Sequence, residues 1–354
     1  MNKRKLFSYL LIALSLPYFS SCEDEKDEET IQLNNGVIVL NQGKMNNNNA
    51  SMSYYNYANS QNTDFFPLVN NRVMGDGGQD ILQYGSKIYI AMSGSSTIEV
   101  VNPKTGKSKS ISITDPLNAP GKPRSLTCAN GKVFAVYYSG YVAQIDTITL
   151  KVEKTVKVGT FPDGSVIANN KLYVSNTGAG TENTLSVINL QSFTEEKKIE
   201  VNMNPYGFID ADSQGDVYVQ SAGDYVSIPA KFQRVEAATG NVTDINIAMN
   251  GFCVYNDTAY IFSYENENWQ AAAGSVKISV YDLKNEVLVK ENIITSTDVE
   301  KTPMGIAVNP YNNDIYLSTS DYVTMGTVYC FSKTGTKKFS FTAGVNPAKF
   351  LFLK

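Results

Sequence analysis

Hydrophobic and polar residues alternate along most of the chain, and one short pattern of them occurs six times. In its form at residues 169–175, a turn precedes a strand in which an aliphatic residue, a tyrosine and a second aliphatic residue follow one another. Such alternation is typical of half-buried β-strands. The other copies are centred on Tyr89, Phe134, Tyr218, Tyr260 and Tyr316. The central aromatic residues are about 39 to 56 residues apart, which is the period of propeller blades.

Each copy belongs to a unit of four predicted strands, A to D. Strand A is a short apolar run, strand B carries the aromatic residue, strand C ends on a turn signal, and strand D alternates. Asp, Asn and Ser side chains in such turns bond their own backbone, and Gly supplies positive φ, so we assign these acids to structure. Six full units run from about residue 77 to 344.

The two ends of the chain supply a seventh unit. Residues 36–69 contain B-like, C-like and D-like strands at 36–40, 52–57 and 65–69, without a strand A, whereas residues 346–353 are a strand A with nothing after it. Pairing the ends closes a ring and removes exposed sheet edges, whereas an open solenoid would end in polar caps. The sequence therefore predicts an all-β, seven-bladed β-propeller closed by its N- and C-terminal strands.

The segment before the repeats is typical of an exported lipoprotein. Basic residues at 3–5 precede an apolar run over 6–19, and two serines stand before Cys22. This order is that of a secretory signal, and the apolar run is too short to be interpreted first as a membrane-spanning helix. Small residues before a cysteine resemble a bacterial lipobox. We therefore expect a signal peptide over residues 1–21 and lipidation of Cys22, the alternative being ordinary cleavage beside a chance cysteine.

A strongly acidic segment follows Cys22. Residues 23–29 hold six acids and one lysine. Its charge density predicts a solvated tether over residues 22–35. An acidic run beside a lipidated cysteine also resembles the signal that sends lipoproteins of Bacteroidetes to the outer face of the outer membrane. We therefore expect a lipid-anchored outer-membrane protein exposed on the cell surface, with the propeller spanning residues 36–354.

Composition excludes several kinds of chemistry. The 354 residues include no His, and the formal net charge is −4. Without His, neither a Ser-His-Asp triad nor a histidine zinc site can be built, and nothing in the charge suggests a nucleic-acid partner. Cys128, Cys253 and Cys330 lie in apolar runs of different units. Such an odd, scattered set is not a disulfide framework, so we interpret these cysteines as small core residues.

The connections between strands vary on one face only. The A–B and C–D turns share one face of a propeller and are short, whereas the B–C and D–A connections share the other face and differ in length. Insertions that gather on one face of a repeat array usually mark its binding face. The variable connections include 42–50, 176–184, 221–231 and 263–274 of the B–C type, and 70–79, 115–123 and 295–303 of the D–A type.

Aromatic, amide and hydroxyl side chains are frequent near the variable face, and this chemistry suits a large, polar, mostly uncharged ligand. The alternative is that they merely decorate loops, where Asn and Tyr are common. We expect no catalytic residue, no metal ligand and no cofactor. The candidate ligand-binding residues are Gln42, Asp80, Ser93, Arg124, Tyr137, Phe161, Asp163, Asn176, Tyr206, Gln220, Tyr225, Phe252, Tyr264, Trp269, Met304, Tyr322 and Asn346.

Two other motifs are weaker. Residues 210–215 resemble the start of a calcium loop, but the fifth position is Gln214 and the twelfth is Ser221, where a bidentate Glu is needed. Carboxylates near the variable face, Asp80 and Asp163 among them, could pair for acid–base work, although nothing in their spacing demands it.

The repeated blade pattern, the seven-unit closure and the lipobox with its acidic segment resemble the YncE-like propeller lipoproteins of Bacteroidetes. Within that group the chain looks most like the cobalamin-binding surface propellers of BtuG type. The resemblance spans the whole chain, but its motifs are architectural and carry over no ligand-binding residue. It implies a non-enzymatic lipoprotein that captures cobalamin (vitamin B12) or related corrinoids and hands them to a TonB-dependent outer-membrane transporter. Lys122 or Arg124 could meet the phosphate of such a ligand.

Two other functions stay open. A glycan-binding or adhesion propeller would use Trp269 and Tyr264 to stack on a sugar. A lactonase-type propeller enzyme would rely on carboxylate or metal chemistry, and the lack of His disfavours it.

Overall fold

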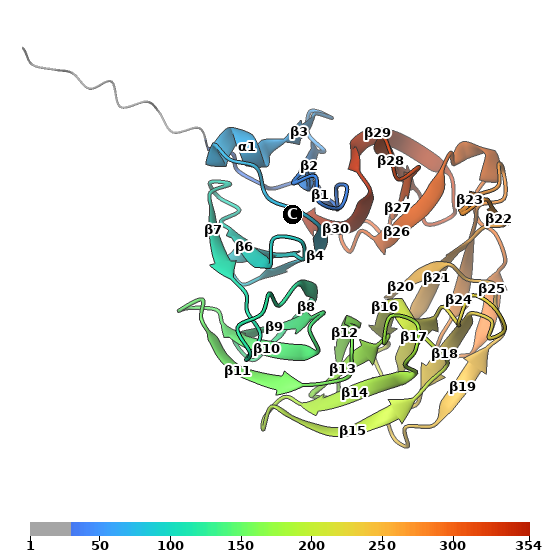
Figure 1. Ribbon diagram of the computed structural model, residues 1–354. Coiled ribbons are helices and arrows are strands. Elements are labelled where there is room, and N and C mark those ends of the chain that lie inside the picture. Colours follow the sequence, from blue (N-terminus) through green and yellow to red (C-terminus); the bar gives the residue numbers. More distant parts are fainter. Residues whose placement is uncertain (1–29) are drawn as a thin grey trace, which may run out of the picture.

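The computed structural model describes residues 30–354, whose strands form seven four-stranded antiparallel sheets arranged as the blades of a propeller (Figure 1). This confirms the predicted all-β, seven-bladed architecture. The predicted signal peptide, Cys22 and the acidic residues 23–29 lie outside the described residues. Within the described part of the chain, no helix is long and apolar enough to cross a membrane.

Each blade is named here from its innermost strand outward. Blade 1 holds β4 (Gly78–Tyr84), β5 (Lys87–Met92), β6 (Thr97–Val101) and β7 (Ser108–Ser112). Blade 2 holds β8 (Pro123–Ala129), β9 (Lys132–Tyr137), β10 (Tyr141–Asp146) and β11 (Val152–Lys157). Blade 3 holds β12 (Pro162–Ala168), β13 (Lys171–Asn176), β14 (Thr184–Asn189) and β15 (Thr194–Glu200). Blade 4 holds β16 (Pro205–Ala211), β17 (Val217–Ser221), β18 (Lys231–Val235) and β19 (Val242–Ile245).

The remaining blades include an inserted hairpin and the closing sheet. Blade 5 holds β20 (Gly251–Tyr255), β21 (Thr258–Ser263), β24 (Lys277–Asp282) and β25 (Val287–Lys290), with the hairpin β22 (Asn266–Glu267) and β23 (Gln270–Ala271) between its second and third strands. Blade 6 follows the short 3-10 helix η1 (Ser296–Asp298) and holds β26 (Thr302–Val308), β27 (Ile315–Ser320), β28 (Met325–Phe331) and β29 (Lys337–Val345). Blade 7 holds β30 (Pro347–Leu353), β1 (Gly36–Asn41), β2 (Ser51–Asn56) and β3 (Asn62–Asp64).

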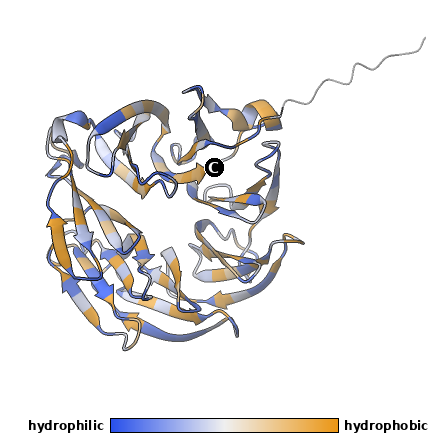
Figure 2. Ribbon diagram, turned by 180° about the vertical axis from the view of Figure 1, so that it is seen from behind, coloured by the Kyte–Doolittle hydropathy of each residue, from blue (hydrophilic) through white to orange (hydrophobic). Residues whose placement is uncertain are grey.

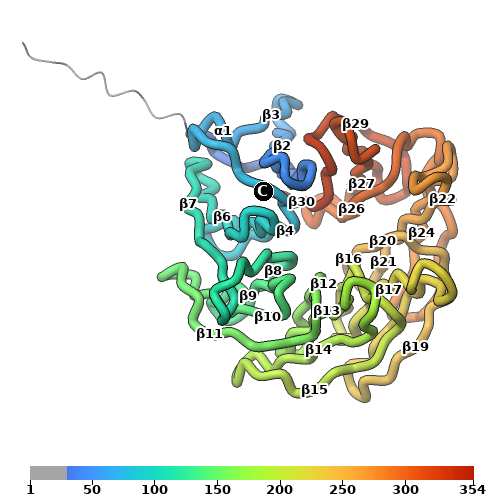
Figure 3. Tube along the Cα trace, viewed as in Figure 1, coloured from blue at the N-terminus to red at the C-terminus, as the bar shows by residue number. Residues whose placement is uncertain are grey.

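Blade 7 joins the two ends of the chain. The C-terminal strand β30 is its innermost strand and pairs antiparallel with β1, in a register that places Ile38 opposite Leu351. Figure 3 shows the blue and the red parts of the described chain meeting in this blade. The innermost strands contact one another all the way around the ring, including β30 with both β4 and β26. The predicted closure by the two terminal strands is therefore present.

A separate hydrophobic cluster fills the interface between each pair of neighbouring blades. Alternation along the strands, visible as orange and blue segments in Figure 2, places one set of apolar side chains on each face of a blade. The central aromatic residue of strand B lies in these clusters: Tyr89 packs with Leu126 and Val133 of the next blade. In blade 7 this position is held by Ile38, which packs with Ile88 of blade 1. The repeated pattern therefore forms the packing between blades.

One predicted strand is a helix instead. Residues 65–69 were expected to form the outer strand of the closing blade, but that strand is the short β3, and α1 (Phe65–Asn70) follows it. The reason is the spacing of apolar residues, because Phe65, Phe66 and Val69 are all buried and only a helical turn brings these positions to one side. Pro67 is tolerated because it lies in the first turn.

We predict that the closing interface is sensitive to cavity formation. Ile38→Ala should lower the free energy of unfolding by about 2–5 kcal/mol, because Ile38 is fully buried in the cluster that joins blades 7 and 1. Ile148→Ala is the matched control, since Ile148 is 87% exposed, and should change stability by less than about 0.5 kcal/mol. Urea unfolding followed by circular dichroism measures both. Equal effects in the two variants would contradict the assigned closure.

Candidate functional site

β-Bulges shape the beginning of the innermost strands. Six of the seven innermost strands shift register against the second strand of their blade. The shift lies within the first residues of the innermost strand, as between Pro123 and Ser125 of β8. A bulge sets two residues against one and re-aims a side chain. Proline is the first residue of β8, β12, β16 and β30, a position where its missing N–H is tolerated. The residues just after these starts thus turn toward the central channel.

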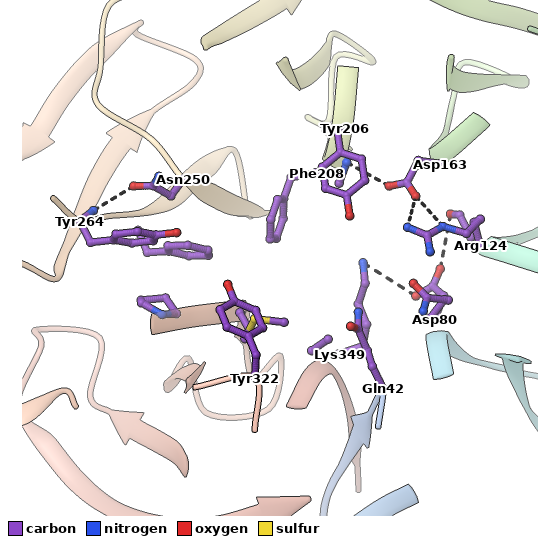
Figure 4. Close-up of a pocket in the computed structure, with 18 residues that line it drawn as sticks. Gln42, Asp80, Arg124, Asp163, Tyr206, Phe208, Asn250, Tyr264, Tyr322 and Lys349 are labelled. Atoms are coloured by element: carbon purple, nitrogen blue, oxygen red, sulfur yellow. Dashed lines mark hydrogen bonds and ion pairs between the residues drawn. The ribbon is translucent and has the colours of Figure 1, made fainter. Parts of the chain in front are cut away.

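These strand beginnings line a cavity of about 360 Å³, which we name the mouth cavity (Figure 4). All seven blades contribute to it, through the innermost strands and through loops that follow second strands. The face of the propeller that carries it, here the mouth face, is the one that holds the variable connections. Its lining consists of Gln42, Gln79, Asp80, Arg124, Ser125, Asp163, Gly164, Tyr206, Gly207, Phe208, Asn250, Phe262, Tyr264, Pro303, Met304, Tyr322, Ala348 and Lys349.

Eight of the candidate residues meet in the mouth cavity. They come from all seven blades, although up to about 280 residues separate them in the sequence. They are Gln42, Asp80, Arg124, Asp163, Tyr206, Tyr264, Met304 and Tyr322.

Three further candidates lie outside the cavity with exposed rings. Tyr225 follows β17, and its hydroxyl accepts a hydrogen bond from Asn204 at 3.2 Å. Phe161 precedes β12 and packs on Tyr138, with ring centroids 4.8 Å apart. Trp269 lies between β22 and β23 and is 78% exposed. All three belong to connections of the mouth face, so they extend an aromatic surface beyond the cavity.

The other candidates have structural surroundings. Tyr137 and Asn176 end second strands but are fully buried, and the Asn176 amide donates to Thr184 and Ser186. Asn346 is also buried, and its amide donates to the Gly43 carbonyl at 2.9 Å. Phe252 packs between blades 4 and 5.

Two candidates remain partly exposed. Ser93, just after β5, donates its backbone N–H to the Gly77 carbonyl. Gln220 lies within β17, and its side-chain oxygen Oε1 is buried without a hydrogen-bond partner.

The mouth cavity also contains residues that the sequence interpretation left out, most importantly Lys349. Its ammonium lies 3.9 Å from the Asp80 carboxylate. A signal for it exists: residues 347–349 align with 78–80 and 123–125 as the beginnings of innermost strands, so Lys349 corresponds in position to Asp80 and Ser125. Asn250, another lining residue, accepts the backbone N–H of Tyr264 at 2.9 Å.

The charged side chains of the mouth cavity are already engaged with protein groups. Arg124 donates from Nε to Asp163 Oδ1 at 2.6 Å, and the other Asp163 oxygen accepts the backbone N–H of Gly207 at 3.0 Å. Asp80 accepts the backbone N–H groups of Leu126 at 2.8 Å and Ile81 at 3.0 Å. Burial raises the pKa of Asp80, while Lys349 and these donors oppose the rise.

A third carboxylate lies deeper in the channel. Asp210 of β16 accepts the backbone N–H of Val254 on the next blade at 2.8 Å and that of Ala211 at 2.9 Å. Burial raises the pKa of Asp210 to about 6, and the two N–H donors reduce the shift only in part. Asp80, Asp163 and Asp210 thus share one role, since each accepts an N–H from the innermost strand of the following blade.

The arrangement supports binding better than acid–base chemistry. The mouth carboxylates lie in ion pairs or accept backbone N–H groups, which stabilise their charge. Among residues 30–354, no group of three or more Asp, Glu, Cys or His side chains is placed to hold a metal ion. Amide, hydroxyl and aromatic groups make up much of the remaining lining. Such a lining can hydrogen-bond and stack on a polar organic molecule.

Comparison with known proteins gives a family and a fold. The sequence model of a family described as "Domain of unknown function (DUF5074)" matches residues 35–353. No curated protein matches the chain.

Among solved structures, the chain is similar to hydrazine synthase of Kuenenia stuttgartiensis (16% identity, TM-score 0.54, covering 70% of this chain and 74% of that one). It is also similar to the computationally designed Ika8 protein (11% identity, TM-score 0.56, covering 90% and 91%). The Neurospora crassa Pan2 WD40 domain is a third similar structure (11% identity, TM-score 0.56, covering 76% and 80%). At these identities the likeness concerns the fold alone.

We predict that Asp210 makes stability depend on pH. Because its folded-state pKa of about 6 exceeds its ordinary value of 3.8, the folded protein holds this proton more tightly, and the contribution is lost as pH rises from about 4 to 7. Asp210→Asn cannot titrate, so its melting temperature relative to wild type should rise across this interval. Thermal unfolding at several pH values measures the difference. A difference that stays constant, or that falls with pH, would contradict the assignment.

Proposed function

The chain belongs to the family described as "Domain of unknown function (DUF5074)", and we propose that it is a non-enzymatic binding protein whose mouth face captures cobalamin or a related corrinoid. The observation that carries a binding role is the mouth cavity itself. All seven blades contribute polar and aromatic groups to one concave site whose carboxylates are already satisfied. The choice of a corrinoid rests on the resemblance of the sequence to BtuG-type propellers.

A corrinoid would be larger than the mouth cavity, so only part of it would enter. A volume of about 360 Å³ lies near the lower end of the range for small-molecule pockets. Gln42, Gln79 and Asn250 can exchange hydrogen bonds with the peripheral amides of a corrinoid that enter the cavity. The exposed rings of Phe161 and Tyr225 would contact the part that stays outside. With no His in the chain, imidazole cannot ligate cobalt, so recognition would be of the corrin periphery.

Neutral overall charge at the mouth also suits such a ligand. Arg124 is matched by Asp163, and Lys349 by Asp80. A strongly charged ligand would therefore find no excess of opposite charge at the mouth. A neutral or zwitterionic ligand needs no such excess, so the balanced charge costs it little binding free energy. Since the carboxylates are held by their partners, neither is a free general base, and the same contacts speak against the lactonase-type alternative.

The expected location and partner complete the proposal. The lipobox with its acidic segment supports a lipid-anchored protein on the outer face of the outer membrane. There it would pass its ligand to a TonB-dependent transporter. For this transfer, the mouth face would have to be oriented toward the transporter when the ligand is released.

Glycan binding is the second candidate function, and one observation favours it. Trp269 is 78% exposed on the hairpin β22–β23, where an indole ring is available to stack on a sugar. Glycan-array binding without cobalamin binding, lost in Trp269→Ala, would select this function.

We predict that cyanocobalamin binds at the mouth cavity. Tyr206→Ala should weaken binding by about tenfold or more, because removal of a central aromatic contact typically costs more than about 1 kcal/mol. Isothermal titration calorimetry of the purified protein measures the affinity. Tyr311→Ala is the matched control, since Tyr311 is 55% exposed in the turn between β26 and β27 on the opposite face, and it should bind as wild type does. Absence of measurable binding to the wild-type protein would refute cobalamin as the ligand.

A further inference from the structure

A second cavity lies deeper in the channel and has a different character. It has a volume of about 190 Å³, which is room for several water molecules, and we name it the deep chamber. It shares Asp80, Phe208 and Lys349 with the mouth cavity, so the two cavities adjoin. Its own walls add Asp210, Cys253, Phe252 and Phe350.

The deep chamber carries an unmatched negative charge. Two carboxylates, Asp80 and Asp210, and one ammonium group, that of Lys349, line it. The Lys349 ammonium lies 3.9 Å from Asp80, whereas no ion pair joins Asp210 to a cation among the described residues. Two backbone N–H groups and the charge of Lys349 stabilise the Asp210 carboxylate, so one ammonium group serves two carboxylates. A buried charge without a counter-ion is costly, so a cation entering the chamber would be stabilised there.

Aromatic rings decide which kind of cation fits. Phe208, Phe252 and Phe350 line the chamber, and the first two have ring centroids 6.3 Å apart. The faces of aromatic rings attract organic cations, and rings combined with a carboxylate are a typical environment for ammonium groups. A metal ion is disfavoured, because no group of three or more Asp, Glu, Cys or His side chains within residues 30–354 is placed to hold one. An anion is disfavoured by the two carboxylates.

We propose that the deep chamber is a binding site for a small alkylammonium compound, with its cationic head at Asp210 and its alkyl part against the phenylalanine rings. This site is separate from the proposed corrinoid site and does not rest on it. Entry would be through the mouth cavity, with which the chamber shares part of its lining. The protein would thus bind a polar neutral ligand at the mouth and a small organic cation beneath it.

The test uses propylammonium chloride as the probe, in an amine-free phosphate buffer. 1-Propanol serves as the neutral analogue of the same length, and sodium chloride at equal concentration controls for ionic strength. Ligand-observed NMR and thermal shift should show saturable binding of propylammonium, with no saturable effect of 1-propanol or sodium chloride. If the wild-type protein shows no saturable binding of propylammonium, the proposal is wrong.

Variants and pH locate the site. Asp210→Asn should reduce the affinity for propylammonium by about tenfold or more, whereas Glu153→Gln, which removes one charge on the outer strand β11, should leave it unchanged. In wild type the affinity should fall as pH drops below about 6, because a proton then occupies Asp210. This second measurement decides the matter even if Asp210→Asn does not fold. The assignment would be overturned if folded Asp210→Asn bound propylammonium with unchanged affinity, or if the affinity of wild type did not depend on pH.

The two proposals fail separately. Asp210 does not line the mouth cavity, so folded Asp210→Asn should bind cyanocobalamin as wild type does. Loss of propylammonium binding together with retained cyanocobalamin binding is expected. Absence of cyanocobalamin binding in wild type would refute the corrinoid and leave the deep chamber to its own test.

Discussion

Everything in this protein depends on closing a ring of sheets. A blade buries both of its faces against neighbours, so an open array would leave two apolar faces in water. Closure takes place in blade 7, where β30 from one end of the chain hydrogen-bonds to β1 from the other. Because that pairing converts the first and last blades into neighbours, seven equivalent interfaces exist, each with its own cluster of buried side chains. The aromatic residue of strand B fills six of them, and Ile38 the seventh.

Closing the ring creates a second problem at its centre. The innermost strand of each blade has one edge with no partner strand, and its backbone N–H groups face the channel or the next blade. Asp80, Asp163 and Asp210 each accept such an N–H from the following blade. These carboxylates therefore fasten neighbouring blades together and satisfy backbone donors that the sheet leaves unpaired. Their position in the channel is a structural necessity first, and it also gives the channel its charge.

The sequence predicts the architecture far better than the site. Blade number and closure follow from the repeated pattern, because a period that recurs six times leaves little freedom. The sequence predicts the direction of a side chain less well, since a shift of one position along a strand moves that side chain to the other face. Asn176 ends β13 near the mouth, but its amide points into the blade and bonds to Ser186. The bulges at the beginning of the innermost strands add a further shift, and Lys349 was missed although its position in β30 matches that of Asp80 in β4.

The chemistry of the channel changes with depth because the first residues of the innermost strands and the residues that follow them have different tasks. Near the mouth, Arg124 and Lys349 each have a carboxylate partner, so the lining is neutral and presents amide and hydroxyl groups. One level deeper Phe252 and Phe350 join Phe208 in the lining, and Asp210 has no ion pair of its own. The reason lies in the same strands: their first residues are bulged and free to vary, whereas the following residues must pack against the neighbouring blade. Asp210 is one such following residue, on β16. The hydrogen bond to Val254 of blade 5 holds it in the channel wall, where it shares the single ammonium group of Lys349 with Asp80 until a second cation enters from outside.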